Sequence, residues 1–197
     1  MLESAHNGYM NWEKLTSEDT SDFIAHVRDD ALIGIFEPDL CETHKAPVNF
    51  YNNAHLIVLE NLSIAPPFAL DYLQSGEDIV YLDGSPEPFQ ILNAKGDLNL
   101  NADTVIDYVD FFCRYVNQRP HNILLLRNPD NMPYQDTIYL DFHFDKNNFG
   151  EKDFRIEDDG NGGFILHAPF VFAGKIDPGI AKISANGDID IKRAVER

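Results

Sequence analysis

Residues 102–117 read ADTVIDYVDFFCRYVN and carry the clearest helical pattern in the chain. Apolar residues recur every three or four positions, which places them on one helix face: Val105, Val109, Phe112 and Val116. Asn101 or Asp103 can cap the start, and Pro120 prevents the helix from continuing. The pattern therefore predicts an amphipathic helix over 102–117, with its apolar stripe packed against the core.

A shorter helix is expected near the N-terminus, at about residues 17–30. Thr16 or Ser17 can cap it, and Glu18 and Asp19 suit the positive end of its dipole. Residues 32–53, which contain two prolines, are expected to be irregular.

Strand patterns lie on both sides of the central helix. Runs rich in Val, Ile, Leu and Phe, bounded by Pro and Gly turn signals, predict strands at 54–64, 78–84, 88–93, 121–127, 136–145, 153–158 and 164–176, followed by a C-terminal hairpin. This order predicts an α+β fold, mainly an antiparallel sheet with the central helix packed on one face. In element order, the C-terminal half resembles the cystatin-like and nuclear-transport-factor-2-like folds, in which a curled antiparallel sheet follows a long helix.

A chain of 197 residues fits one domain. We expect a single domain over 1–197, in which residues 1–45 form a helical and irregular N-terminal extension. A division near residue 97 into two subdomains is the alternative.

The C-terminal hairpin has a register that its side chains specify. A two-residue turn at Asn186-Gly187 would pair Ile183 with Asp190, which mixes apolar and charged residues on one face. A three-residue loop instead pairs Ile183 with Ile189 and Lys182 with Asp190. Because that loop needs a left-handed residue at its third position, Gly187 favours it. We expect this register, with Ile183, Ile189 and Ile191 buried together.

Acidic residues dominate the charge of the protein, with 33 Asp and Glu against 15 Lys and Arg and a net charge of −18. This balance disfavours nucleic acids and anionic membranes, which both attract Lys and Arg. No Lys or Arg occurs between Lys45 and Lys95, and the acids in this stretch form a candidate surface for a basic protein partner: Glu60, Asp71, Glu77, Asp78, Asp83 and Glu87. Solubility alone is the favoured explanation of the acidity, with a partner surface as the other interpretation.

Residues 141–145 read DFHFD and raise the question of a ligand site. Asp141 and His143 share one strand face, and with His167 they could bind a metal or act as acid and base in a pocket. The same alternation is typical of a strand with one solvated face, which is the favoured interpretation. We therefore expect no metal and no cofactor, and we retain these three residues as candidate ligand contacts.

Other catalytic signals are missing from the sequence. It has no GxSxG, GxGxxG, Walker A, HExxH or kinase motif. Cys41 and Cys113 lack metal-site spacing. The sequence does not decide whether a disulfide bond joins them. The first residues do not resemble a signal peptide, and no apolar run has the length of a membrane span, so we expect a soluble, cytoplasmic protein.

The sequence favours a non-enzymatic, acidic protein-interaction domain that binds a basic protein, as an adaptor or a neutralising protein. A small-molecule-binding or hydrolase-like pocket around Asp141 and His143 is the alternative, so an enzymatic role stays open. The sequence does not distinguish a monomer from a homodimer.

Overall fold

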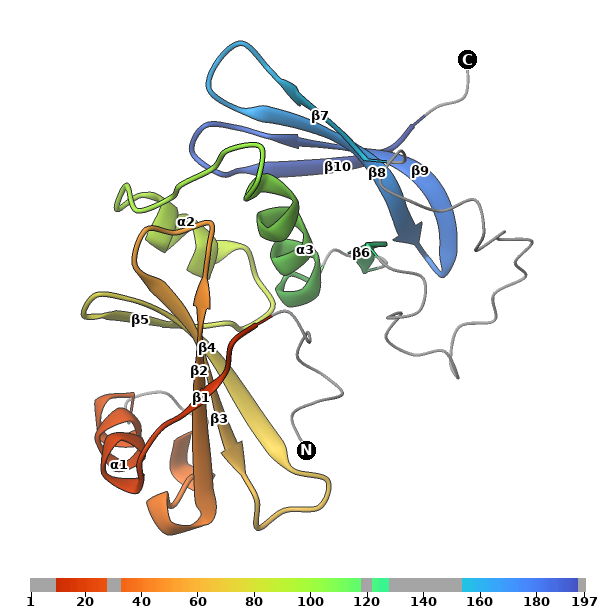
Figure 1. The fold of residues 1–197 in the computed structure, drawn as a ribbon. Helices are drawn as coiled ribbons and strands as arrows, with labels where there is room; N and C mark the ends of the chain where they lie inside the picture. The colour runs from red at the N-terminus through yellow and green to blue at the C-terminus, as the bar shows by residue number, and fades with distance from the viewer. Residues whose placement is uncertain (1–9, 28–32, 118–121, 128–153, 195–197) are drawn as a thin grey trace. The chain divides into compact units, whose positions relative to one another are not determined.

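The computed structural model describes residues 10–27, 33–117, 122–127 and 154–194, and Figure 1 shows their secondary structure. The predicted α+β class is confirmed, but the strands form two antiparallel sheets where one was expected. The chain groups into two compact units, Met1–Leu82 and Asp83–Arg197. The predicted strand at 136–145, which includes Asp141 and His143, lies outside the described residues.

The first unit is built on a five-stranded sheet in which neighbours along the chain are neighbours in space. Every pair of adjacent strands is antiparallel. In chain order the strands are β1 (Glu13–Lys14), β2 (Cys41–Val48), β3 (Ala54–Asn61), β4 (Phe68–Ser75) and β5 (Asp78–Tyr81). The other elements are the helix α1 (Ser17–His26) and two 3-10 turns, η2 (Ile33–Ile35) and η3 (Pro38–Leu40).

Helix α1 confirms the predicted N-terminal helix and ends at His26. Thr16 caps its start, because the Thr16 hydroxyl accepts a hydrogen bond from the backbone N–H of Asp19 at 3.1 Å. Its apolar side chains join one core cluster with Phe36, which follows η2, and with side chains from β3 and β4: Phe23, Ile24, Val27, Phe36, Ile57, Leu59, Leu70 and Tyr72. The edge of one ring in this cluster meets the face of another, with the Phe23 and Tyr72 centroids 5.3 Å apart.

Strand β2 corrects the expectation that residues 32–53 are irregular. Its sequence, CETHKAPV, has few residues that favour strands, yet it pairs along its whole length with β3, from Cys41 opposite Asn61 to Val48 opposite Ala54. Pro47 is tolerated because β1 pairs with β2 at His44 and Lys45, so Pro47 lies beyond this pairing, where β2 has an edge. The partner strand, rather than local propensity, makes this segment extended.

The second unit combines two helices with a second sheet. The helices are α2 (Glu87–Asn93) and α3 (Val105–Tyr115). The strands are β6 (Ile123–Leu125), β7 (Arg155–Asp158), β8 (Phe164–Phe172), β9 (Lys175–Ile183) and β10 (Ile189–Arg193). Their order is β10-β9-β8-β6, and β7 pairs with the other end of β8.

Helix α3 confirms the predicted central helix, although its regular part is shorter than 102–117. The predicted stripe is buried, and so are Tyr108 and Phe111, which shows that the helix is enclosed on more than one side. Asn101 caps the preceding turn, since its Oδ1 accepts hydrogen bonds from the backbone N–H groups of Asp103 and Thr104.

Helix α2 shows that the predicted strand at 88–93 was wrong. A short apolar run such as PFQILN does not distinguish a strand from a helix by its period. In the structure Phe89 and Leu92, three residues apart, are both buried. The Phe89 ring contacts Phe112 of α3 with centroids 5.3 Å apart, and this packing selects the helix.

The predicted register of the C-terminal hairpin is confirmed. Ile183 lies opposite Ile189, and Lys182 lies opposite Asp190. Gly187 has a φ of +83°, and its N–H donates to the Ser184 carbonyl oxygen at 2.9 Å, as a three-residue loop requires. The expected burial is confirmed for Ile183 and wrong for Ile189 and Ile191, which are half-buried because β10 is an edge strand.

Candidate functional site

His167 is the described member of the three predicted ligand contacts. It lies in β8 between the buried residues Leu166 and Ala168, so its side chain projects from the opposite face, where it is 38% exposed. Its Nε2 lies 3.4 Å from an oxygen of Glu157, and Arg155 lies 2.9 Å from the same oxygen. His167 is therefore part of a charged cluster on an open strand face.

No metal centre is formed by the residues that the structure describes, since none of their His, Cys, Asp and Glu side chains gather in a group of three or more that could hold an ion. Asp141 and His143 lie outside those residues, so the expected absence of a metal stays a prediction.

Neither cysteine has the features of a nucleophile, and both are free thiols. Burial raises the pKa of the Cys113 thiol in α3 well above its ordinary value. Burial, and then the negative charge of Glu37, raise the pKa of Cys41. A reactive cysteine needs the opposite shift, because the thiolate is the nucleophile.

The six acids predicted as a partner surface divide between the two units. Glu60 and Asp71 project from the same face of the first sheet, where Glu60 is 9% exposed and Asp71 is half-buried. Glu77 and Asp78 lie together at the turn between β4 and β5. Asp83 and Glu87 belong to the second unit. Hydrogen bonds from Ser85 hold the pKa of Asp83 below its ordinary value.

Sequence analysis missed a polar cluster on β1, β2 and β3. Glu42 lies directly opposite Glu60, and the Lys14 ammonium lies 2.5 Å from a Glu42 oxygen. The hydrogen bond from Lys14 lowers the pKa of Glu42. His44 shares this face, and burial lowers its pKa despite the two glutamates nearby. Lys14 is therefore paired with Glu42 on the surface of the sheet, and His44 is a neutral imidazole at neutral pH.

The first unit is strongly negative in the described ranges, which contain eleven Asp and Glu against two Lys and no Arg. Both lysines already have partners: Lys14 pairs with Glu42, and Lys45 lies 3.4 Å from Glu13. Several of the carboxylates are exposed on α1 and around η3: Glu18, Asp19, Asp22, Glu37 and Asp39. This unit therefore presents negative charge to solvent over two adjoining elements.

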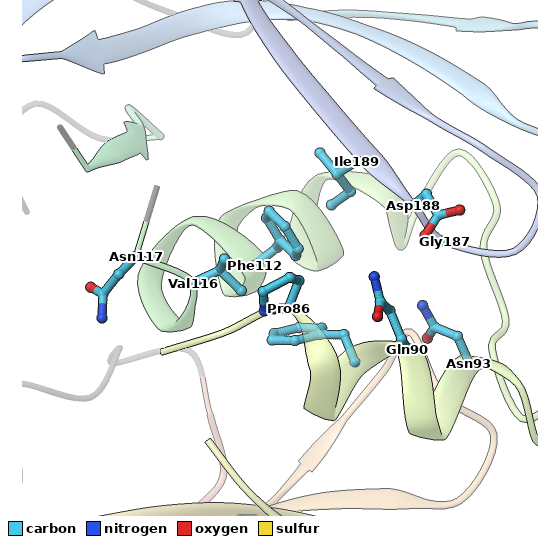
Figure 2. Close-up of a pocket in the computed structure, with 10 residues that line it drawn as sticks. Pro86, Gln90, Asn93, Phe112, Val116, Asn117, Gly187, Asp188 and Ile189 are labelled. Carbon is cyan, nitrogen blue, oxygen red and sulfur yellow. The ribbon is translucent and has the colours of Figure 1, made fainter. Parts of the chain in front are cut away.

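The second unit contains a cavity of about 350 Å³ beside α2, α3 and the C-terminal hairpin (Figure 2). Gln90 and Asn93 project from α2 toward the hairpin. The lining residues are Pro86, Phe89, Gln90, Asn93, Phe112, Val116, Asn117, Gly187, Asp188 and Ile189. Three carboxamides and one carboxylate can hydrogen-bond a small polar ligand above the apolar residues, but this lining includes no histidine for proton transfer near neutral pH.

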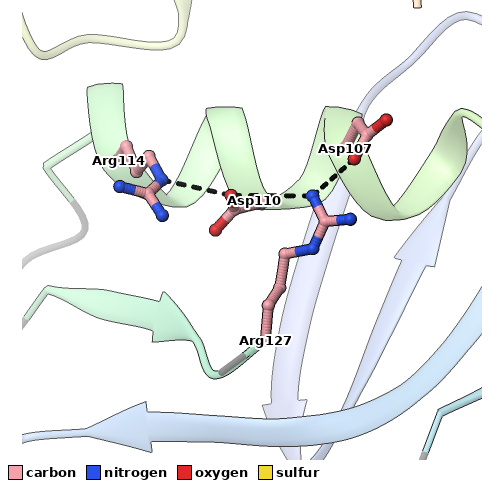
Figure 3. A network of polar contacts seen from close by, with 4 residues as sticks. All are labelled: Asp107, Asp110, Arg114 and Arg127. Atoms are coloured by element: carbon pink, nitrogen blue, oxygen red, sulfur yellow. Dashed lines mark hydrogen bonds and ion pairs between the residues drawn. The ribbon is translucent and has the colours of Figure 1, made fainter. Parts of the chain in front are cut away.

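A polar network fastens the end of β6 to α3 (Figure 3). Asp110 is 4% exposed and accepts a hydrogen bond from Arg114 Nε at 3.1 Å. Arg127, just beyond β6, is hydrogen-bonded to Asp107 and lies 4.0 Å from Asp110. The positive charges of two guanidinium groups compensate the negative charge of the buried Asp110 carboxylate. The network therefore has a structural role.

Among the described residues, no helix combines the length and the apolarity needed to cross a bilayer. No protein-family model, curated protein or solved structure matches the chain. The likeness in element order to the cystatin-like and nuclear-transport-factor-2-like folds is therefore not confirmed, and function has to be inferred from the residues themselves.

Proposed function

We propose that the chain is a non-enzymatic, acidic protein-interaction domain that binds a basic protein partner, as an adaptor or a neutralising protein. One observation carries this proposal: the described part of the first unit has eleven carboxylates and two ammonium groups, and both ammonium groups are already paired. A surface of one charge sign raises the association rate of an oppositely charged partner.

The same charge argues against other macromolecular partners. Nucleic acids and anionic lipid surfaces repel a carboxylate-rich face, because both are recognised through Lys and Arg. A cytoplasmic location belongs to this proposal, and two free thiols are consistent with a reducing compartment.

A pull-down from the native source tests the proposed function. The full chain would serve as bait beside a variant in which four exposed or half-exposed carboxylates become amides: Asp22→Asn, Glu37→Gln, Asp39→Asn and Asp78→Asn. We expect a basic protein that the unaltered chain retains at low salt, that high salt releases, and that the variant retains poorly, because exposed charges are screened beyond about 8 Å at physiological salt. Recovery of neutral or acidic proteins, equally by both baits and at both salt levels, would contradict the proposal.

The cavity in the second unit supports a second candidate function, the binding of a small polar molecule. Its three carboxamides outnumber its single carboxylate, that of Asp188, and this lining favours hydrogen bonding of a polar ligand. We expect titration of a library of small polar compounds to shift the side-chain amide NMR signals of Gln90 and Asn117. If no compound shifts either signal at millimolar concentration, this candidate fails. The hydrolase-like alternative around Asp141 and His143 concerns residues outside the described ranges and stays a prediction.

A further inference from the structure

Exposed apolar side chains gather at one end of the first unit. We call this set the apolar end and define it by five residues: Ile35 (49% exposed), Leu40 (44%), Leu62 (46%), Ile64 (40%) and Phe68 (40%). Among the described residues, Ile91 of α2 is the other large apolar side chain with comparable exposure. Single exposed apolar residues are ordinary, whereas a gathered group marks an interaction site.

Hydrogen bonds hold the apolar end in place. The N–H of Leu62 donates to the carbonyl oxygen of Leu40 at 3.0 Å, which ties the β3–β4 connection to η3. Asn61, which is 2% exposed, donates from Nδ2 to the carbonyl oxygen of Ile35 at 2.8 Å. Its Oδ1 accepts from both the N–H and the hydroxyl of Ser63. The exposed side chains are therefore carried on a backbone that is fixed from two directions.

Aromatic packing joins the apolar end to the core of the first unit. Phe36 is buried in the core cluster beneath α1, and its ring lies 6.0 Å from that of Phe68. Phe68 thus rests with one side on the core and is 40% exposed on the other. This arrangement favours a preformed contact surface, which lowers the entropy lost when a partner binds.

Exposed carboxylates lie beside the apolar end. Glu37 and Asp39 are exposed between Ile35 and Leu40 in the chain. The sequence contains no Lys or Arg in residues 33–44 or 46–94, so neither segment that forms the apolar end supplies a cation. Helix α1, which packs against η3, adds further exposed carboxylates. A partner that complements this region needs both positive charge and large apolar side chains.

We propose that the apolar end binds a basic segment of a partner protein that carries large apolar side chains, with Lys or Arg of that segment facing Glu37 and Asp39. This inference rests on the proposed function and supplies its docking site. Apolar burial is expected to contribute most of the affinity, and the carboxylates to contribute the charge preference, because exposed ion pairs add little.

Binding of three synthetic peptides to the full chain tests the inference. One peptide contains Lys and Leu, the second has Ser in place of Leu, and the third has Glu in place of Lys. At low salt we expect the Lys/Leu peptide to bind more tightly than the other two. Leu62→Ser and Leu40→Ser should each weaken its binding by about tenfold or more, and Glu37→Gln by a few-fold.

Ile91→Ser is the matched control, because it removes an equally exposed apolar side chain from the other unit and should leave binding unchanged. Circular dichroism checks that each variant is folded. Shifts of backbone NMR signals in the unaltered chain, expected at residues 35–40 and 62–68, test the same surface without substitution.

The outcomes separate the docking site from the proposed function. If the Lys/Ser peptide binds as tightly as the Lys/Leu peptide, or the leucine variants bind normally, the docking site is wrong and the proposed function survives. If neither Lys-containing peptide binds at low salt, the proposed function fails as well. If the unaltered chain forms a dimer in sedimentation and Leu62→Ser disperses it, a second copy occupies the apolar end and the inference is overturned.

Discussion

The two units carry nearly the same number of carboxylates and differ in their cations. The described residues of the first unit contain eleven acids and two bases, whereas those of the second contain twelve acids and eight bases. Five of these eight bases lie against acids of the same unit: Arg114 with Asp110, Arg127 with Asp107, Arg155 with Glu157, Lys192 with Asp190 and Arg193 with Asp177. The second unit thus offsets more of its negative charge with its own bases, while the first unit has two bases for eleven acids.

Apolar side chains follow the same division. The second unit encloses an aromatic group in which Phe89 contacts Tyr108, Phe111 and Phe112. The first unit leaves the apolar end exposed beside its carboxylates. Both units have a buried core, so the units differ in the apolar end, which the first unit leaves exposed, and not in internal packing itself.

The largest expected effect tests the internal packing of the second unit. Phe112→Ala should lower the free energy of unfolding by about 3–5 kcal/mol, because Phe112 is 8% exposed and its removal leaves a cavity. Urea denaturation measures the loss. Leu62→Ala in the apolar end is the control and should change stability by less than about 0.5 kcal/mol. A similar loss of stability from both substitutions would show that Phe112 is no more important for packing than the exposed Leu62.

Gly187→Ala should be the next largest effect, at about 2–4 kcal/mol. A methyl group at this position would meet Tyr108 Oη at 2.7 Å and collide with the Asn93 amide, and the φ of +83° adds backbone strain. Gly76 in the first unit also has a positive φ, +62°, but among the described residues no atom beyond its two chain neighbours lies within 4 Å of the added methyl. Gly76→Ala isolates the strain and should cost about 1 kcal/mol. Equal losses in thermal melts would show that the hairpin does not pack closely on the helices.

Ion pairs should differ between the units by a smaller amount. Asp110→Asn should lower stability by about 1–3 kcal/mol, because a buried carboxylate between two guanidinium groups loses its charge. Lys14→Ala breaks an exposed pair of the first unit and should cost less than about 0.5 kcal/mol. Urea midpoints compare the two. If Lys14→Ala proves the costlier change, charge is structural in the first unit as well.

The smallest effect concerns Tyr108 and depends on pH. Tyr108→Phe should cost about 1 kcal/mol at neutral pH, because the hydroxyl donates to the Gly187 carbonyl oxygen at 2.7 Å. Burial raises the pKa of Tyr108 to about 12 in the folded state, from an ordinary value of 10.0. The protonated phenol therefore stabilises the fold below pH 10, and this contribution is lost as the pH rises from 10 to about 12.

The Tyr108→Phe variant lacks this titration, so its stability should fall less steeply over the same pH window. The difference between the two proteins in urea melts cancels the titration of other groups. Parallel curves for both proteins between pH 10 and 12 would contradict the raised pKa.

Sequence predicted those elements whose patterns are strong and local. The helical spacing from Val105 to Val116 specified α3, and the opposed Lys182 and Asp190 specified the register of the hairpin. Elements whose conformation depends on a partner strand were not predicted. Strand β2 is an example, because pairing with β3, rather than its own residues, makes it extended. The turn between β8 and β9 was also missed, because Ala173 adopts a φ of +52° without being a usual turn residue.

The candidate surface was predictable only in part. Sequence showed the stretch without Lys or Arg, but it could not show that Glu60 is buried in a sheet or that Leu62 is exposed. Exposure depends on which residues the folded chain brings over each side chain, and this is not a property of a local pattern. The cavity was not predicted for a related reason. Gln90 and Asn93 line it together with the hairpin only because residues 88–93 are helical.

The hydrogen bond from Tyr108 to Gly187 also bears on the order in which the second unit folds. It joins residues 79 positions apart, and closing a loop of that length costs about 4 kcal/mol of chain entropy. Strands β8, β9 and β10 are connected by short turns, so they close small loops and can pair early. We therefore expect docking of the hairpin tip on α3 to be a late step in folding, after β8, β9 and β10 have paired.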